Sequence, residues 1–132
     1  MTENKLAQCT YYYPRISKNW LEKNGFRYNK VFSSSEDGEI YTMRFPVISW
    51  NMYVTVEAEI LFNFTENIAH INCYDKGTRS LYAAWYSNYY GDYTPIIDKI
   101  NEIIEKKVKK MGLIVKDNNR NSLFDIPKKG EK

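Results

Sequence analysis

A long alternation of apolar and polar residues in the middle of the chain constrains its fold more than any other feature. From 52 to 64, every even position is apolar and most odd positions are polar. The seven apolar positions are Met52, Val54, Val56, Ala58, Ile60, Phe62 and Phe64. Side chains of a strand point alternately to its two faces, so this pattern predicts a β-strand with one apolar face. Such mixed faces are typical of an antiparallel sheet with one side in water.

The residues that follow predict a hairpin partner at 68–74. A tight turn is expected around Glu66 and Asn67, because Asn tolerates the left-handed conformation that such a turn requires. The expected pairs across the hairpin are Ala69, Ile71 and Cys73 with Ile60, Phe62 and Phe64, and His70 with Asn63.

Weaker strand signals lie on both sides of this hairpin. The segments 26–32, 41–45 and 80–86 are strand candidates, and Pro46 predicts a break or bulge after the second of them. The first fifteen residues are expected to be irregular, with Tyr11 to Tyr13 extended because Pro14 disfavours a helical residue before it.

The clearest helix signal lies at 94–112. Thr94 can cap this helix and Gly112 can end it. Its apolar residues fall on one face: Ile96, Ile97, Ile100, Ile103, Ile104, Val108 and Met111. A shorter helix is expected between Ser17, which can cap it, and Gly25, which can end it in a left-handed residue.

These elements predict an α+β fold. We expect an antiparallel sheet of four or five strands, a long C-terminal helix packed on one face and a short N-terminal helix. The 132 residues are typical of a single domain, expected to span 1–132. Its ordered core is expected at about 14–115, and the polar residues at about 116–132 are expected to form a flexible tail.

Charge is distributed unevenly along the chain. Residues 1–93 hold nine basic and ten acidic groups, net −1, whereas residues 94–132 hold ten and six, net +4. This mild bias falls short of the basic stripe of a dedicated nucleic-acid binder, and it also argues against a mimic of DNA. The polar start at 1–8, the lack of a long apolar run and only two cysteines predict a cytoplasmic protein without a membrane segment.

Residues capable of catalysis form no recognisable motif. His70 is the sole histidine, and Glu57 and Glu59 share one strand face, as solubility alone would require. The glycines are isolated, so no loop resembles a phosphate cradle. We therefore expect no enzyme activity, no catalytic or metal-binding residue and no cofactor. A hydrolase built on His70 with Glu59 is the alternative that these residues leave open.

Tyrosine is the residue that points most directly to binding. Five of the twelve tyrosines lie within 82–93, and exposed Tyr rings are frequent anchors of protein interfaces. The predicted partner-binding residues are Tyr86, Tyr89, Tyr90 and Tyr93, with Lys106, Lys107 and Lys110 as secondary contacts. The alternatives are that 80–86 is a strand buried on both faces and that the lysines are a solvated helix face.

The layout resembles that of a group of small accessory proteins. A helix at 20–26 precedes an antiparallel meander, and Tyr90-Gly91-Asp92-Tyr93 leads into an Ile- and Lys-rich helix that ends Met111-Gly112-Leu113. This arrangement is similar to proteins encoded by phages and mobile elements of AT-rich bacteria, a group that includes anti-CRISPR proteins.

The resemblance implies a function in inhibition. Many such proteins act by occupying a surface of a host enzyme, so we expect a non-enzymatic inhibitor that binds a host protein such as a defence nuclease. The alternative is an RNA or single-stranded DNA binder that uses the basic helix face and aromatic residues.

Overall fold

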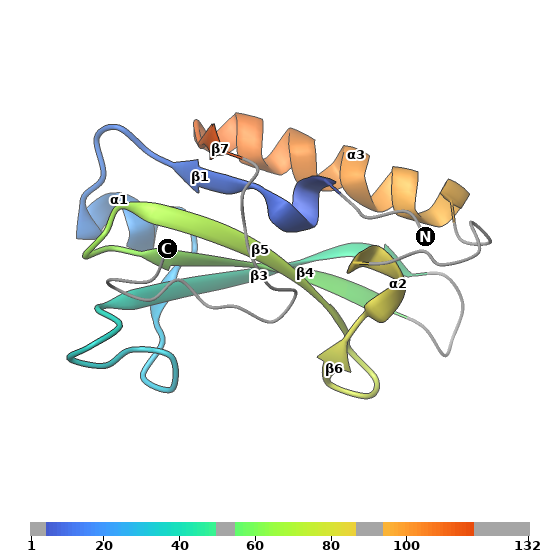
Figure 1. Cartoon of the computed structure of the whole chain (residues 1–132), viewed down its shortest axis with the longest axis horizontal. Coiled ribbons are helices and arrows are strands. Elements are labelled where there is room, and N and C mark those ends of the chain that lie inside the picture. The colour runs from blue at the N-terminus through green and yellow to red at the C-terminus, as the bar shows by residue number, and fades with distance from the viewer. Residues whose placement is uncertain (1–4, 50–54, 87–93, 118–132) are drawn as a thin grey trace.

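A computed structural model of the chain describes residues 5–49, 55–86 and 94–117. They form a mixed α+β fold around one antiparallel sheet (Figure 1). The elements in chain order are η1 (Lys5–Gln8), β1 (Thr10–Tyr12), α1 (Lys18–Lys23), β2 (Arg27–Tyr28), β3 (Ile40–Ser49), β4 (Thr55–Asn63), β5 (Ile68–Asp75), β6 (Ser80–Leu81), α2 (Ala83–Tyr86), α3 (Thr94–Met111) and β7 (Ile114–Asp117).

Within the described residues the sheet has seven strands rather than the predicted four or five. Its strands follow the order β2-β3-β4-β5-β1-β7, and β6 pairs with β5 off this path. The strands β1 and β7 were not predicted, because strands of three and four residues are too short to show alternation. Both strands also extend the ordered core beyond the expected limits of 14 and 115.

The β4–β5 hairpin forms, but its register differs by two residues from the prediction. Phe62 pairs with Ala69, and His70 lies opposite Leu61 rather than Asn63. The turn is longer than expected because the Asn63 side chain shapes it: its Oδ1 accepts a hydrogen bond from the Glu66 amide at 3.0 Å. Asn67 takes the predicted left-handed conformation, with φ of 58°.

Pro46 lies within β3 instead of ending it. The register between β3 and β4 shifts between Pro46 and Ile48, so the predicted bulge is present. The neighbouring strand β2 pairs with β3 only at Thr42 and Tyr41. Because β2 does not reach Pro46, the missing amide of this proline removes no hydrogen bond to β2.

The helices begin and end close to the predicted residues, with one exception. Ser17 caps α1 by accepting a hydrogen bond from the Trp20 amide at 3.1 Å. Gly112 follows α3 with φ of 81°. The exception is 83–86, which we expected to continue a strand and which forms the short helix α2.

The apolar residues of β4 and the apolar stripe of α3 build one core. In Figure 1, α3 runs along one side of the sheet. The buried cluster joins the even positions of β4 to α3: Val56, Ala58, Ile60, Phe62, Ile97, Ile100, Ile104 and Val108. We call this side of the sheet the α3 face and the opposite side, which carries Glu57, Glu59 and Leu61, the polar face.

The polar face is more buried than its pattern predicted. Glu59, Leu61 and Asn63 of β4 and His70 and Asn72 of β5 are all buried. The expectation of one side fully in water is therefore wrong for this part of the sheet. Burial of polar groups requires partners, and several of these partners define the sites described below.

Candidate interaction surface

Tyr86 lies in the core and not at the surface. Its side chain is 2% exposed. Its hydroxyl accepts a hydrogen bond from the Cys73 amide at 3.1 Å and donates to Asn72 Oδ1 at 3.1 Å. A buried ring with both hydrogen-bond roles filled cannot anchor a partner, so its assignment as a binding residue is wrong.

The position of Tyr86 follows from the way β5 is paired. β4 occupies one edge of β5, while β1 pairs with the other edge at Ala69 and β6 pairs with it at Tyr74 and Asp75. Between these two short strands, the Cys73 amide bonds Tyr86 and the Cys73 carbonyl accepts from the Tyr82 amide at 2.9 Å. The segment 82–86 therefore supplies hydrogen-bond partners to the part of the β5 edge that neither β1 nor β6 covers.

The other predicted binding residues have different outcomes. Tyr89, Tyr90 and Tyr93 lie outside the described residues. Lys106 and Lys110 are exposed on α3, and Lys106 forms an ion pair with Glu102 at 3.2 Å. Lys107 is partly buried: its Nζ lies 5.6 Å from the centroid of the Phe45 ring.

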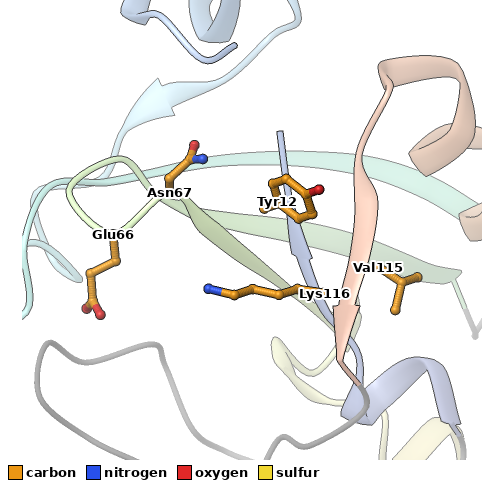
Figure 2. Close-up of a pocket in the computed structure, with 5 residues that line it drawn as sticks. All are labelled: Tyr12, Glu66, Asn67, Val115 and Lys116. Atoms are coloured by element: carbon orange, nitrogen blue, oxygen red, sulfur yellow. The ribbon is translucent and has the colours of Figure 1, made fainter. Parts of the chain in front are cut away.

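A pocket of about 500 Å³ opens where β1, β7 and the β4–β5 turn meet (Figure 2). Its described lining residues are Tyr12, Glu66, Asn67, Val115 and Lys116. The Lys116 side chain extends toward the turn that carries Glu66, whereas Val115 points away from it (Figure 2). The buried Asn67 Oδ1 accepts no hydrogen bond from the described residues. The pocket thus combines a positively charged hydrogen-bond donor, Lys116, with a negatively charged acceptor, Glu66.

A bulge in β7 explains how Lys116 reaches this pocket. Tyr11 pairs with Val115 and Thr10 with Asp117, so Lys116 is an extra residue without a partner on β1. Bulges of this kind bend the strand and change the direction of a side chain. The sequence gives no signal for such a bulge, because it depends on the register between two distant segments.

β7 also exposes apolar side chains at the end of the sheet. Ile114 is 45% exposed and Val115 is 52% exposed. Among the residues described, only Tyr28 and Val31, near the opposite end of the sheet, are large apolar groups of similar or greater exposure. We call Ile114, Val115 and Lys116, together with Lys109 and Lys110 at the end of α3, the β7 corner.

The polar face carries an ion pair that crosses the sheet. Arg44, Glu59 and Asn72 are directly opposite one another on three neighbouring strands. Arg44 Nε donates to Glu59 Oε2 at 3.0 Å. Burial is the largest single influence on Arg44 and lowers its pKa, but the hydrogen bond to Glu59 and the charges of Glu59, Tyr74 and Glu57 together raise that pKa above its ordinary value. Burial, with the nearby charge of Glu59, also raises the pKa of Tyr74.

Glu59 and His70, the residues of the hydrolase alternative, are each engaged in another contact. Glu59 is committed to Arg44, and His70 Nε2 lies 3.0 Å from Thr10 Oγ1. Thr10 and His70 are both buried, so their pair joins β1 to β5 and is not open to a substrate. Burial raises the pKa of the Cys73 thiol well above its ordinary value, which disfavours the reactive thiolate.

Metal-ligating side chains do not gather in the described residues: no group of three or more His, Cys, Asp or Glu residues is close enough there to hold an ion. Within the same residues, no helix has the length and apolar character that crossing a membrane requires.

Comparison with known proteins finds no relative of this chain. Neither a protein-family model, a curated protein nor a solved structure matches it. The fold and the contacts of its own residues are therefore what supports a function.

Proposed function

We propose that this protein acts by binding another protein, without catalysis, and that its target is a host defence protein such as a nuclease. The observation that supports a binding function is the β7 corner. It combines an edge strand, two exposed apolar side chains and a pocket within a few residues. Apolar anchors surrounded by polar groups are the usual composition of a protein interface.

The choice of target rests on the resemblance in layout to the accessory proteins of phages and mobile elements. An inhibitor of that group would act in the cytoplasm of the host cell. It needs no cofactor and no substrate pocket, because occupying a functional surface is sufficient to block an enzyme.

A capture experiment with a matched control tests this function. The tagged protein would be incubated with bacterial lysate that contains nucleases of host defence. Nucleic acid would be left intact in one sample and digested with an added nonspecific nuclease in the other. The retained proteins would be identified by mass spectrometry. We expect one protein to be retained after nucleic acid is digested. That protein would then be purified and titrated with the tagged protein by calorimetry.

Variants assign the binding to a surface. Ile114→Thr with Val115→Thr removes apolar contact area while keeping residues suited to a strand. We expect this pair to weaken binding of the captured protein at least about tenfold, equivalent to 1.4 kcal/mol. The control is Tyr28→Thr with Val31→Thr, which removes the exposed apolar residues near the other end of the sheet. Equal effects of the two pairs would contradict the assignment.

Nucleic-acid binding is the second candidate, because the segment 106–116 holds five lysines and no carboxylate. Phosphate contacts release counterions, so such binding weakens steeply with salt. Four contacting lysines would give a slope of about −3 in a plot of log affinity against log salt for a single strand. Recovery of nucleic acid alone from the lysate, with this slope, would replace the protein-binding proposal.

A further inference from the structure

The outer edge of β7 has the geometry of a strand-docking site. β7 is the last strand in the path of the sheet, and its pairing is with β1. Among the described strands none pairs with its other edge. Backbone groups along such an edge can bond an extended segment from another chain.

The side chains of β7 favour an added strand. Neighbouring strands place side chains of the same face about 5 Å apart, so an added strand would cover part of both Ile114 and Val115. Ile114 lies on the face of Tyr12, its pairing partner, and Val115 lies on the face of Tyr11. A partner strand with β-branched residues would therefore find an apolar contact on each face.

The positive charge of the β7 corner determines which kind of strand could dock on β7. Lys109, Lys110 and Lys116 are exposed and take part in none of the ion pairs found within the described part of the chain. A second copy of this protein would bring another set of the same lysines to the interface, and like charges oppose that pairing. An acidic segment would instead neutralise them.

The pocket determines where acidic residues of a docked strand would be favoured. Glu66 lies on the far side of the pocket from Val115 (Figure 2), and its carboxylate accepts a weak hydrogen bond from Asn63 Nδ2 at 3.4 Å. An acidic side chain is therefore favoured beside Lys116 and disfavoured beside Glu66. A neutral polar side chain suits the part of the pocket formed by Tyr12 and Asn67.

We propose that β7 is the docking edge for an extended, acidic segment of the partner protein, which pairs with β7 as an additional strand. This inference rests on the proposed function, since it names how the partner is held. Main-chain hydrogen bonds would supply affinity, while the exposed lysines and Ile114 and Val115 would select the sequence.

Peptide probes test the docking mode without knowledge of the partner. The first probe is a fluorescein-labelled octapeptide of alternating Glu and Val. The second has the same sequence with every backbone amide N-methylated, which retains the charge but removes all main-chain donors. The third replaces Glu with Lys, and the fourth is oligo(dT) of the same net charge as the first. Binding would be measured by fluorescence anisotropy at physiological salt.

We expect the first peptide to bind at least about tenfold tighter than each of the other three probes, a difference of 1.4 kcal/mol. Equal binding of the N-methylated peptide would overturn strand addition. Tighter binding of oligo(dT) would assign the surface to nucleic acid. Failure of the first peptide to bind at concentrations up to about 1 mM, which corresponds to 4.1 kcal/mol, would also overturn the inference.

Protein variants place the peptide on the β7 corner. The triple change Lys109→Glu, Lys110→Glu and Lys116→Glu should weaken the acidic peptide at least about tenfold. The control changes three other exposed lysines, Lys23→Glu, Lys30→Glu and Lys99→Glu, and should weaken it much less. Far-UV circular dichroism checks that both variants fold, and equal effects would place the peptide elsewhere.

The two proposals fail in different ways. If a captured protein binds the β7 variants as tightly as it binds the parent protein, and the peptides do not bind the parent protein, the docking edge is wrong while the binding function stands. If no protein is captured, the function itself is wrong. Analytical ultracentrifugation of the protein alone tests whether a second copy of this protein occupies the edge. A dimer that dissociates in the Ile114→Thr, Val115→Thr variant would assign the edge to a second copy.

Discussion

At the scale of single residues, Tyr86 shows how a tyrosine can serve the sheet instead of a partner. Its hydroxyl bonds the Cys73 amide in the interval of the β5 edge that neither β1 nor β6 covers. Backbone amides that are buried need an acceptor. The sequence shows Tyr86 within a tyrosine cluster but does not show that this amide lacks a neighbouring strand.

The change Tyr86→Phe tests this role. It removes the acceptor of a buried amide and the donor to Asn72, so the free energy of unfolding should fall by about 1–3 kcal/mol. Urea unfolding followed by circular dichroism measures it. The control Tyr28→Phe alters an exposed ring and should change the value by less than about 0.5 kcal/mol. If the two changes had equal effects, the hydroxyl of Tyr86 would have no structural role.

Buried ionisable groups allow a second test at the scale of single residues, through the pH dependence of stability. Burial raises the pKa of Tyr11, Cys73 and Tyr74 above their ordinary values. In the unfolded chain these groups lose protons from about pH 9 upward, whereas the folded chain still holds them. Proton loss therefore stabilises the unfolded state, and stability should decline above this pH.

The expected slope is about 1.4 kcal/mol per pH unit for each group whose proton only the folded state retains. Urea unfolding at pH 7.5, 9 and 10 measures it. The Tyr74→Phe variant should show a shallower decline than the parent protein. A free energy of unfolding that stays constant across this range would contradict the burial of these hydroxyl and thiol groups.

At the scale of elements, sequence patterns predicted the long elements, and the strand candidates at 26–32 and 80–86 contain the short strands β2 and β6. The strands β1 and β7 were not predicted. The alternation of β4 and the stripe of α3 each repeat over several periods, so their type is readable from the chain. β1 and β7 have three and four residues, and their pairing is decided by neighbours that are distant in sequence. The candidate binding surface was therefore missed, although Leu113, Ile114 and Val115 after the Gly112 helix end were a signal for a strand.

Gly112 controls how α3 passes into β7. Its φ of 81° suits glycine, and a Cβ at this position would lie 3.1 Å from Tyr13 Cε1. Gly112→Ala should therefore lower the free energy of unfolding by about 1–2 kcal/mol from the backbone alone. It should also weaken partner binding, because β7 begins two residues later.

The control for this change is Gly77→Ala. Gly77 is not among the described residues of positive φ, so alanine there should cost less stability. Thermal unfolding by calorimetry compares the two variants. A Gly77→Ala variant less stable than Gly112→Ala would show that the helix end does not depend on the left-handed residue.

At the scale of the whole molecule, the two faces of the sheet have different roles. The α3 face holds the apolar core, and the polar face holds the Arg44–Glu59 ion pair and the Thr10–His70 contact. Charge patterning located the basic end of α3 in advance, and composition favoured binding over catalysis. The register of the hairpin, the bulge at Lys116 and the burial of Tyr86 could not be predicted, since each depends on contacts between distant segments.

The most direct test of the account is hydrogen exchange of the protein with and without the purified captured partner, followed by mass spectrometry. The account predicts that the amides of 114–117 exchange more slowly in the complex, while those of Arg27 and Tyr28 at the other edge are unchanged. Slowing at that other edge alone, or no slowing at 114–117, would contradict binding at the β7 corner.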